Sequence, residues 1–173
     1  RLPHLGVNGF AGELGHTCVV EGGRQCGCGH KGWLETYCTE RGLIQTVKEL
    51  LAEGRESSKL KDVNELNIKT VVDCCEDGDE VAIEAFSRVG HMLGIGVANY
   101  ASVMDPEAVI LTGDMAQAGK WLLKPMRVSF EDHVFHNIRG KVRILVSILR
   151  EGERDVLGAS ALAWDVKEYS LFK

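Results

Sequence analysis

The sequence lacks an excess of positive charge. Its 173 residues include 20 lysines and arginines against 25 aspartates and glutamates, which gives a formal net charge of -5 at pH 7. A protein that attracts nucleic acid or an anionic membrane by bulk electrostatics carries a basic surplus. Neither nucleic acid nor a membrane surface is therefore expected as a partner of this chain.

Long apolar runs are missing as well. No stretch approaches the roughly 18 to 20 apolar residues that cross a bilayer, and no basic start followed by an apolar segment suggests a secretion signal. Hydrophobic residues still make up 45% of the chain and charged residues 26%, which is the balance of a globular protein with a real core. We expect a soluble cytoplasmic protein.

The beginning of the chain lacks both a methionine and any helix or strand pattern. It reads RLPHLGVNGFAGELGH, and residues 1–33 contain nine glycines, which predicts irregular structure with short strands. A glycine-rich polar stretch usually connects helices or strands that lie before and after it in a protein. We therefore expect the chain to be the C-terminal part of a larger protein.

Apolar spacing predicts helices and two strands in the rest of the chain. Leu43, Val47 and Leu50 recur at three- and four-residue steps, which indicates an amphipathic helix over 34–53 with Thr39 as a candidate N-cap. The other predicted elements are helices over 68–75, 80–104 with Asp79 as cap, from 119 to about 133, and 155–168, and buried strands over 108–112 and 141–149. This order predicts one α/β domain with a parallel sheet.

Some conspicuous residues are expected to serve the structure. Gly90, Gly94 and Gly96 could suggest a phosphate loop, but they fall inside the long periodic helix, which favours close helix packing. Cys74 and Cys75 are adjacent, and adjacent cysteines rarely share a disulfide or a metal. We expect them to be buried thiols.

Two other cysteines form a candidate metal site. A chain of this length and apolar content does not need disulfide staples, although it has six cysteines. Cys26 and Cys28 are separated by one glycine, which permits a tight turn with both sulfurs on one side. Zinc takes four thiolate or imidazole ligands at tetrahedral corners. With His16 nearby, the pair favours metal binding.

The segment over residues 12–35 makes this interpretation more specific. It reads GELGHTCVVEGGRQCGCGHKGWLE and resembles the zinc-and-sugar segment of the ROK family of bacterial sugar kinases and sugar-responsive repressors. ROK proteins have GELGH, a variable hairpin and then CxCGxxGCLE, and their histidine and three cysteines bind one zinc that holds the sugar-binding loop. The resemblance assigns His16, Cys26 and Cys28 to the metal.

One position departs from the family pattern. Trp33 stands where ROK proteins have their third cysteine, and an indole offers zinc no lone pair. His30 or a water could fill the fourth corner. Because structural zinc sites depend on a complete ligand set, the resemblance implies a zinc that is weakened or absent.

The same resemblance assigns sugar binding to Glu13, His16 and Glu35, whose family equivalents contact sugar hydroxyls. A site that hydrogen-bonds hydroxyls rejects analogues without them. Taken without the motif, Glu13 would cap a turn and Glu35 would be stabilised by the dipole of the following helix. The whole segment favours the sugar role.

A nucleotide contact is expected where the first predicted strand ends, at Thr112, Gly113 and Asp114. A helix N-terminus offers backbone N–H groups to an anion, and in ROK kinases this segment ends in two glycines and lies against the nucleotide. Asp114 replaces the second glycine and would repel phosphate unless Mg²⁺ or a turned-away rotamer intervenes. ATP with Mg²⁺ is the expected co-substrate.

The resemblance implies a fold and an activity. It is strongest to the C-terminal part of a ROK glucokinase, so residues 1–173 would form an actin-like, ribonuclease-H-like ATPase lobe with a parallel or mixed sheet flanked by helices. The complete protein would phosphorylate a glucose-like hexose and form a homodimer, and the helix over 155–168 would pack on the N-terminal lobe.

The catalytic base of ROK kinases, an aspartate in an Asn-Asp motif, and their first phosphate loop lie upstream and have no counterpart in this sequence. The isolated chain is therefore expected to be inactive. Two alternatives stay open: a sugar-sensing module of a ROK transcriptional repressor, and a degenerate dimerisation module without catalysis.

Overall fold

A computed structural model describes residues 6–55, 57–149 and 151–165, which fall into two compact units. The larger unit spans Leu14–Val146 and contains most of the candidate site residues. The smaller unit takes the described residues before and after that range, including helix α6 (Glu151–Asp165). The C-terminal residues of the predicted helix over 155–168, from 166 on, lie outside the described residues.

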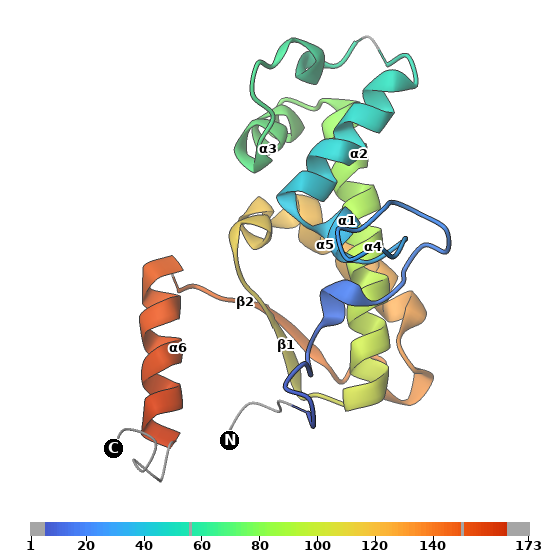
Figure 1. Cartoon of the computed structure of the whole chain (residues 1–173). Helices are drawn as coiled ribbons and strands as arrows, with labels where there is room; N and C mark the ends of the chain where they lie inside the picture. Colours follow the sequence, from blue (N-terminus) through green and yellow to red (C-terminus); the bar gives the residue numbers. More distant parts are fainter. Residues whose placement is uncertain (1–5, 56, 150, 166–173) are drawn as a thin grey trace. The chain divides into compact units, whose positions relative to one another are not determined.

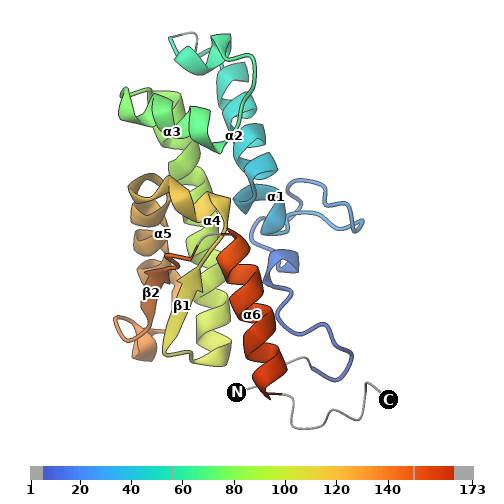
Figure 2. The same cartoon turned by 90° about the vertical axis from the view of Figure 1, so that its left-hand side faces the viewer.

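The larger unit is organised around one long helix. Helix α4 (Glu80–Met104) has 25 residues, and α5 (Lys120–His133) lies against it in both views of the molecule (Figures 1 and 2). The remaining elements of this unit are the 3-10 turns η1 (Leu14–His16), η2 (Lys59–Asp62), η3 (Asp114–Ala118) and η4 (His136–Ile138), helices α1 (Glu35–Cys38), α2 (Glu40–Ala52) and α3 (Ile68–Glu76), and strands β1 (Ala108–Leu111) and β2 (Arg143–Val146).

Helix α4 packs into two hydrophobic clusters, one near each end. Its first half, including Phe86 and Val89, packs with α2, α3 and η2, and its second half, including Val97 and Ala101, packs with α5 and the strands. By length and composition α4 could cross a membrane, but 56% of its most apolar window is buried inside the structure. A core helix shows this combination.

Glycines let α4 and α5 approach closely. A Cβ atom at Gly94 would lie 2.5 Å from the Ser129 Cβ and 2.6 Å from the Met126 carbonyl oxygen, and one at Gly90 would lie 2.8 Å from the Leu122 carbonyl oxygen. No side chain fits at these separations. The prediction of close helix packing is confirmed for Gly90 and Gly94, whereas a Cβ atom at Gly96 would meet the Leu34 side chain, 2.5 Å away.

The helix boundaries follow local capping. Thr39 accepts a hydrogen bond from the Gly42 N–H, so it is the N-cap that the sequence suggested, but its extended backbone (φ -96°, ψ 169°) divides the predicted helix into α1 and α2. Asp79 caps α4 as predicted, since its carboxylate accepts hydrogen bonds from the N–H groups of Val81 and Ala82. Burial of Cys74 and Cys75 is likewise confirmed.

The two strands pair in parallel, as predicted, with Ala108 opposite Arg143. They are shorter than the predicted 108–112 and 141–149, and the expectation that they are fully buried is wrong. Ile110 is 63% exposed and Leu145 42% exposed. Successive side chains of a strand point to opposite faces, and within the described residues one face of the pair packs on α4 and α5.

Gly94→Ala is expected to lower the free energy of unfolding by about 1–3 kcal/mol, because the added methyl group meets the α5 backbone. Urea unfolding followed by circular dichroism measures this change. Gly158→Ala in α6 is the matched control, since outside its own helix nothing among the described residues lies within 4 Å of the new Cβ. Equal stability of Gly94→Ala and the unsubstituted protein would contradict the close approach.

Candidate functional site

The metal candidates lie on an irregular hairpin over residues 17–34, here named the cysteine hairpin. Two isolated antiparallel bridges hold its arms together, one between Cys18 and Trp33 and one between Gln25 and Lys31. The turn beyond the second bridge is closed by a 2.8 Å hydrogen bond from the Cys26 N–H to the His30 carbonyl. The CxC sequence therefore occupies the tip of the hairpin.

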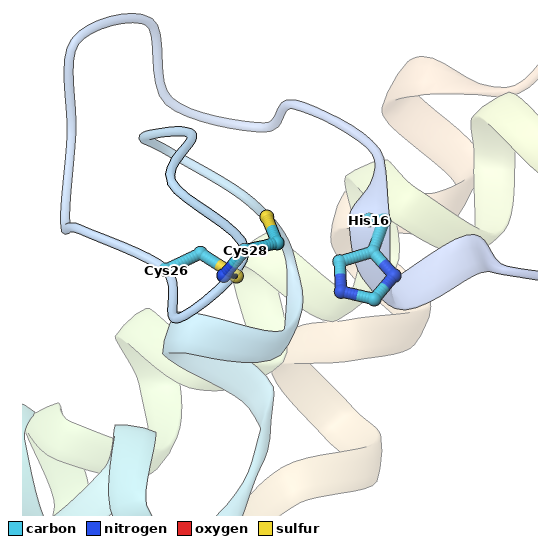
Figure 3. Close-up of side chains that lie close together, drawn as sticks. All are labelled: His16, Cys26 and Cys28. Carbon is cyan, nitrogen blue, oxygen red and sulfur yellow. Dashed lines mark hydrogen bonds between the residues drawn. The ribbon is translucent and has the colours of Figure 1, made fainter.

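The hairpin tip faces His16 of η1. The ligand atoms of His16, Cys26 and Cys28 all lie within 4.8 Å of one another, and Figure 3 shows the imidazole on one side of the two cysteine side chains. The Cys28 N–H donates to the Cys26 sulfur at 3.3 Å, which stabilises the turn. The structure thus brings the three predicted metal ligands together.

This donor set fits zinc in kind, since thiolate sulfur and imidazole nitrogen are its usual protein ligands. Tetrahedral zinc ligands lie within about 4 Å of each other, and the three ligand atoms, all within 4.8 Å of one another, are near that spacing. His16, Cys26 and Cys28 would hold the ion from three corners. Bound there, zinc would fix the hairpin tip against η1.

Trp33 lies between two histidines of this region. Its ring meets the rings of His16 and His30 edge-on, with centroid distances of 5.1 and 5.3 Å. The His30 Nδ1 lies 3.8 Å from the Cys28 sulfur, but His30 does not belong to the group in which every ligand atom is within 4.8 Å of the others. His30 therefore lies beside the three ligands and does not complete the set.

Glu35 connects the metal candidates with the sugar candidates. Its Oε1 accepts a 3.0 Å hydrogen bond from the Cys26 thiol, and its Oε2 lies 3.5 Å from the His16 Nε2. The side chains of Glu35 and His16 are 40% and 35% exposed, so a ligand from solvent can reach both. Glu13, the third sugar candidate, is exposed and belongs to the smaller unit.

Comparison with known proteins identifies the family. The family model described as "ROK family" matches residues 2–166. The chain belongs to the ROK family.

Relatives of this ROK chain include both enzymes and regulators. It is 32% identical over 167 residues to a glucokinase of Halalkalibacterium halodurans, covering 94% of the chain and 49% of that protein. It is 31% identical over 159 residues to a xylose repressor of Caldicellulosiruptor bescii, covering 91% of the chain and 40% of the repressor. The chain thus spans half or less of these relatives' length.

A solved structure agrees with the family assignment. A ROK family glucokinase from Streptomyces griseus, in complex with glucose and AMPPNP, superimposes with a TM-score of 0.77 at 31% identity and covers 89% of this chain and 51% of its own. The chain has the actin-like ATPase fold of ROK sugar kinases, helix-rich with a small parallel sheet, as the sequence resemblance implied.

The predicted nucleotide residues follow β1. Gly113 has a φ of 88°, a value that favours glycine, and Asp114 begins the five-residue turn η3. The Asp114 carboxylate accepts a 3.4 Å hydrogen bond from the Gln117 amide, and Thr112 is exposed. Because α5 begins only at Lys120, no long helix starts directly at Gly113. A nucleotide role for these residues stays a prediction.

Sequence reasoning missed Arg24, which lies two residues before the CxC turn. Its side chain is only 16% exposed, and its guanidinium bonds to α1 and α2. A single arginine in a polar, glycine-rich loop gives no periodic or motif signal. Only the fold reveals that its partners, far along the chain, converge on it.

The two thiols of the hairpin tip have different acidities. The hydrogen bond that the Cys26 thiol donates to Glu35 raises the pKa of Cys26 to about 11. Interaction with the Cys26 side chain, followed by the backbone of His30, lowers the pKa of Cys28 to about 7. At neutral pH the pair thus consists of one protonated thiol and one partly ionised sulfur.

This difference predicts selective alkylation of the metal-free protein. Because the thiolate is the nucleophile, the rate of iodoacetamide modification at Cys28 should rise with a midpoint near pH 7, while Cys26 stays unmodified up to pH 9. Peptide mass spectrometry across pH 6–9 measures both rates. Glu35→Gln should make Cys26 more reactive, and equal rates in the unsubstituted protein would contradict the assigned asymmetry.

Proposed function

We propose that this ROK chain is the sugar-binding part of a kinase that transfers phosphate from ATP to a glucose-like hexose. The observation that carries the proposal is the juxtaposition of Glu35 and His16, 3.5 Å apart and both partly exposed, beside the cysteine hairpin. The Streptomyces griseus glucokinase, solved with glucose and AMPPNP, supports the choice of hexose and nucleotide.

The chemistry of the two side chains suits a sugar. A carboxylate accepts hydrogen bonds from two hydroxyls, and an imidazole donates or accepts one. Held together by the fold, they recognise a fixed pattern of hydroxyls and reject sugars that lack it. Glu13 is the third sugar ligand in this proposal. Phosphoryl transfer needs little more from this part of the enzyme than a well-positioned acceptor hydroxyl.

The remaining parts of the proposal concern groups beyond the sugar. Thr112, Gly113 and Asp114 contact ATP, with Mg²⁺ neutralising the phosphates near the Asp114 carboxylate. The base that takes the hydroxyl proton belongs to a segment outside this chain, so the chain alone is inactive. A cytoplasmic homodimer is the proposed form of the complete protein.

A sugar-sensing repressor is the second candidate, favoured by the 31% identity to a xylose repressor. Calorimetry of the complete gene product with glucose, xylose and N-acetylmannosamine, together with an assay for ADP release, separates the candidates. A kinase releases ADP with the sugar that it binds. A repressor binds a sugar without ADP release, and a degenerate module binds none.

Glu35→Gln is expected to weaken hexose binding by roughly 10- to 100-fold, since hydrogen bonds to a charged acceptor contribute about 1.5–3 kcal/mol. Calorimetry with glucose on the complete gene product measures the dissociation constant. Glu21→Gln, at an exposed glutamate of the same hairpin, is the matched control. Unchanged affinity of Glu35→Gln would remove Glu35 from the sugar site.

Trp33→Cys is expected to restore the fourth metal ligand and to raise zinc affinity by several orders of magnitude, because structural zinc sites use four thiolate or imidazole ligands. Competition with a chromophoric chelator measures the affinity, and metal analysis gives the stoichiometry. Trp33→Ser removes the indole without adding a thiolate and serves as control. A tightly held zinc in the unsubstituted protein would contradict the weakened site.

A further inference from the structure

We infer that Arg24 is a positioning residue that holds the sugar-binding carboxylate of Glu35 and the cysteine hairpin in place without relying on a metal. The inference rests on the proposed hexose site. The side chain of Arg24 is mostly buried, although the residue belongs to an irregular polar segment.

All five N–H donors of the Arg24 guanidinium are used. Nη1 donates to the carbonyls of Thr36 and Gly42, each at 3.0 Å. Nη2 donates to the Thr46 hydroxyl at 2.9 Å and to the Glu49 carboxylate at 2.6 Å, and Nε donates to the other Glu49 oxygen at 3.2 Å. One side chain thus binds the second residue of α1 and three positions of α2.

The backbone of Arg24 is tied to the same region. Its N–H donates to the Tyr37 hydroxyl at 2.9 Å, and the guanidinium carbon lies 4.6 Å from the centre of the Tyr37 ring. Its carbonyl accepts a 2.8 Å hydrogen bond from the Gly32 N–H on the opposite arm of the hairpin. Both arms of the cysteine hairpin are therefore connected through this residue to α1 and α2.

Helix α1 needs such support. It has four residues, Glu35–Cys38, and a helix of this length is not stable by itself. Glu35 is its first residue, and the Thr36 carbonyl, which bonds to Arg24, is next along the chain. The position of the Glu35 carboxylate therefore depends on contacts that hold α1 from outside.

The metal cannot give this support at full strength, because Trp33 has replaced one family ligand. The hydrogen-bond partners of the Arg24 guanidinium include no metal candidate. Thr36, which bonds to Arg24, directly follows Glu35 in the chain, and Arg24 itself lies two residues before Cys26. The hydrogen bonds from Arg24 to α2 therefore also restrain Glu35 and Cys26. The network thus keeps the hairpin and Glu35 in register whether or not zinc is bound.

Lysine is the informative substitution at this position. It keeps the positive charge but presents one ammonium group, which cannot reproduce the planar, five-donor geometry of arginine. Arg24→Lys is therefore expected to leave several acceptors unpaired and to release α1 and the hairpin together.

The experiment compares glucose affinity by calorimetry in the complete gene product, with and without a zinc chelator. Arg24→Lys should weaken glucose binding by at least about tenfold, because losing hydrogen bonds from a charged donor shifts an equilibrium by that factor. The chelator should change the affinity of the unsubstituted protein by less than twofold. Unchanged affinity in Arg24→Lys, or loss of binding on chelation alone, would overturn the inference.

Two control variants separate positioning from general stability. Val47→Ala opens a cavity in the core face of α2, where Val47 is fully buried, and lowers stability without touching the hairpin. Arg41→Lys changes an exposed arginine of α2 that lines the same surface cavity as Arg24. Both are expected to keep glucose affinity at temperatures where they are folded. If Val47→Ala weakened glucose binding as much as Arg24→Lys does, the effect of Arg24 would be one on overall stability and not on the position of Glu35.

Amide hydrogen exchange tests the inference even without a sugar. Exchange across residues 24–38 should accelerate by at least about tenfold in Arg24→Lys and stay unchanged in Arg41→Lys. Only Arg24→Lys removes the guanidinium hydrogen bonds that connect the hairpin to α1 and α2. Equal protection in all variants would overturn the inference. If the unsubstituted protein binds no hexose, the proposed function fails, and the exchange result decides the role of Arg24 in holding the hairpin.

Discussion

The close approach of backbones along α4 is the constraint on which the rest of the larger unit depends. Gly94 admits the α5 backbone on one side. On another side Gly96 receives Leu34, whose Cδ2 would lie 2.5 Å from a Cβ at position 96. Leu34 is buried and directly precedes Glu35, so the glycines that pack the core also set the starting point of the candidate site.

Polar contacts then refine the position that the core sets. The cysteine hairpin buries only two of its apolar side chains, Cys26 and Leu34, and its arms are joined by isolated bridges, not by a continuous strand ladder. Buried, fully bonded polar groups specify one arrangement because any alternative leaves donors unpaired. Arg24 supplies this specificity for the two arms of the hairpin, and His16, Glu35 and the two cysteines meet at its tip.

Local patterns in the sequence were sufficient for the caps Thr39 and Asp79 and for the parallel pairing of the strands, because each depends on neighbouring residues or on element order. The motif also indicated correctly that His16 and the two cysteines come together. Strand burial could not be predicted, since the exposure of Ile110 depends on which elements cover each face. Arg24 could not be predicted either, because nothing in the sequence connects an arginine in an irregular loop with acceptors that lie 12 to 25 residues further along the chain.

The position of Glu35 lets one carboxylate serve two partners. Its Oε1 accepts a hydrogen bond from the Cys26 thiol, which fastens the first residue of α1 to the turn of the cysteine hairpin. A carboxylate has about four lone-pair sites, so Glu35 keeps acceptors for the sugar hydroxyls of the proposed function while it holds this thiol. A protonated cysteine thus contributes to the position of the sugar ligand through its proton, and this contribution needs no metal.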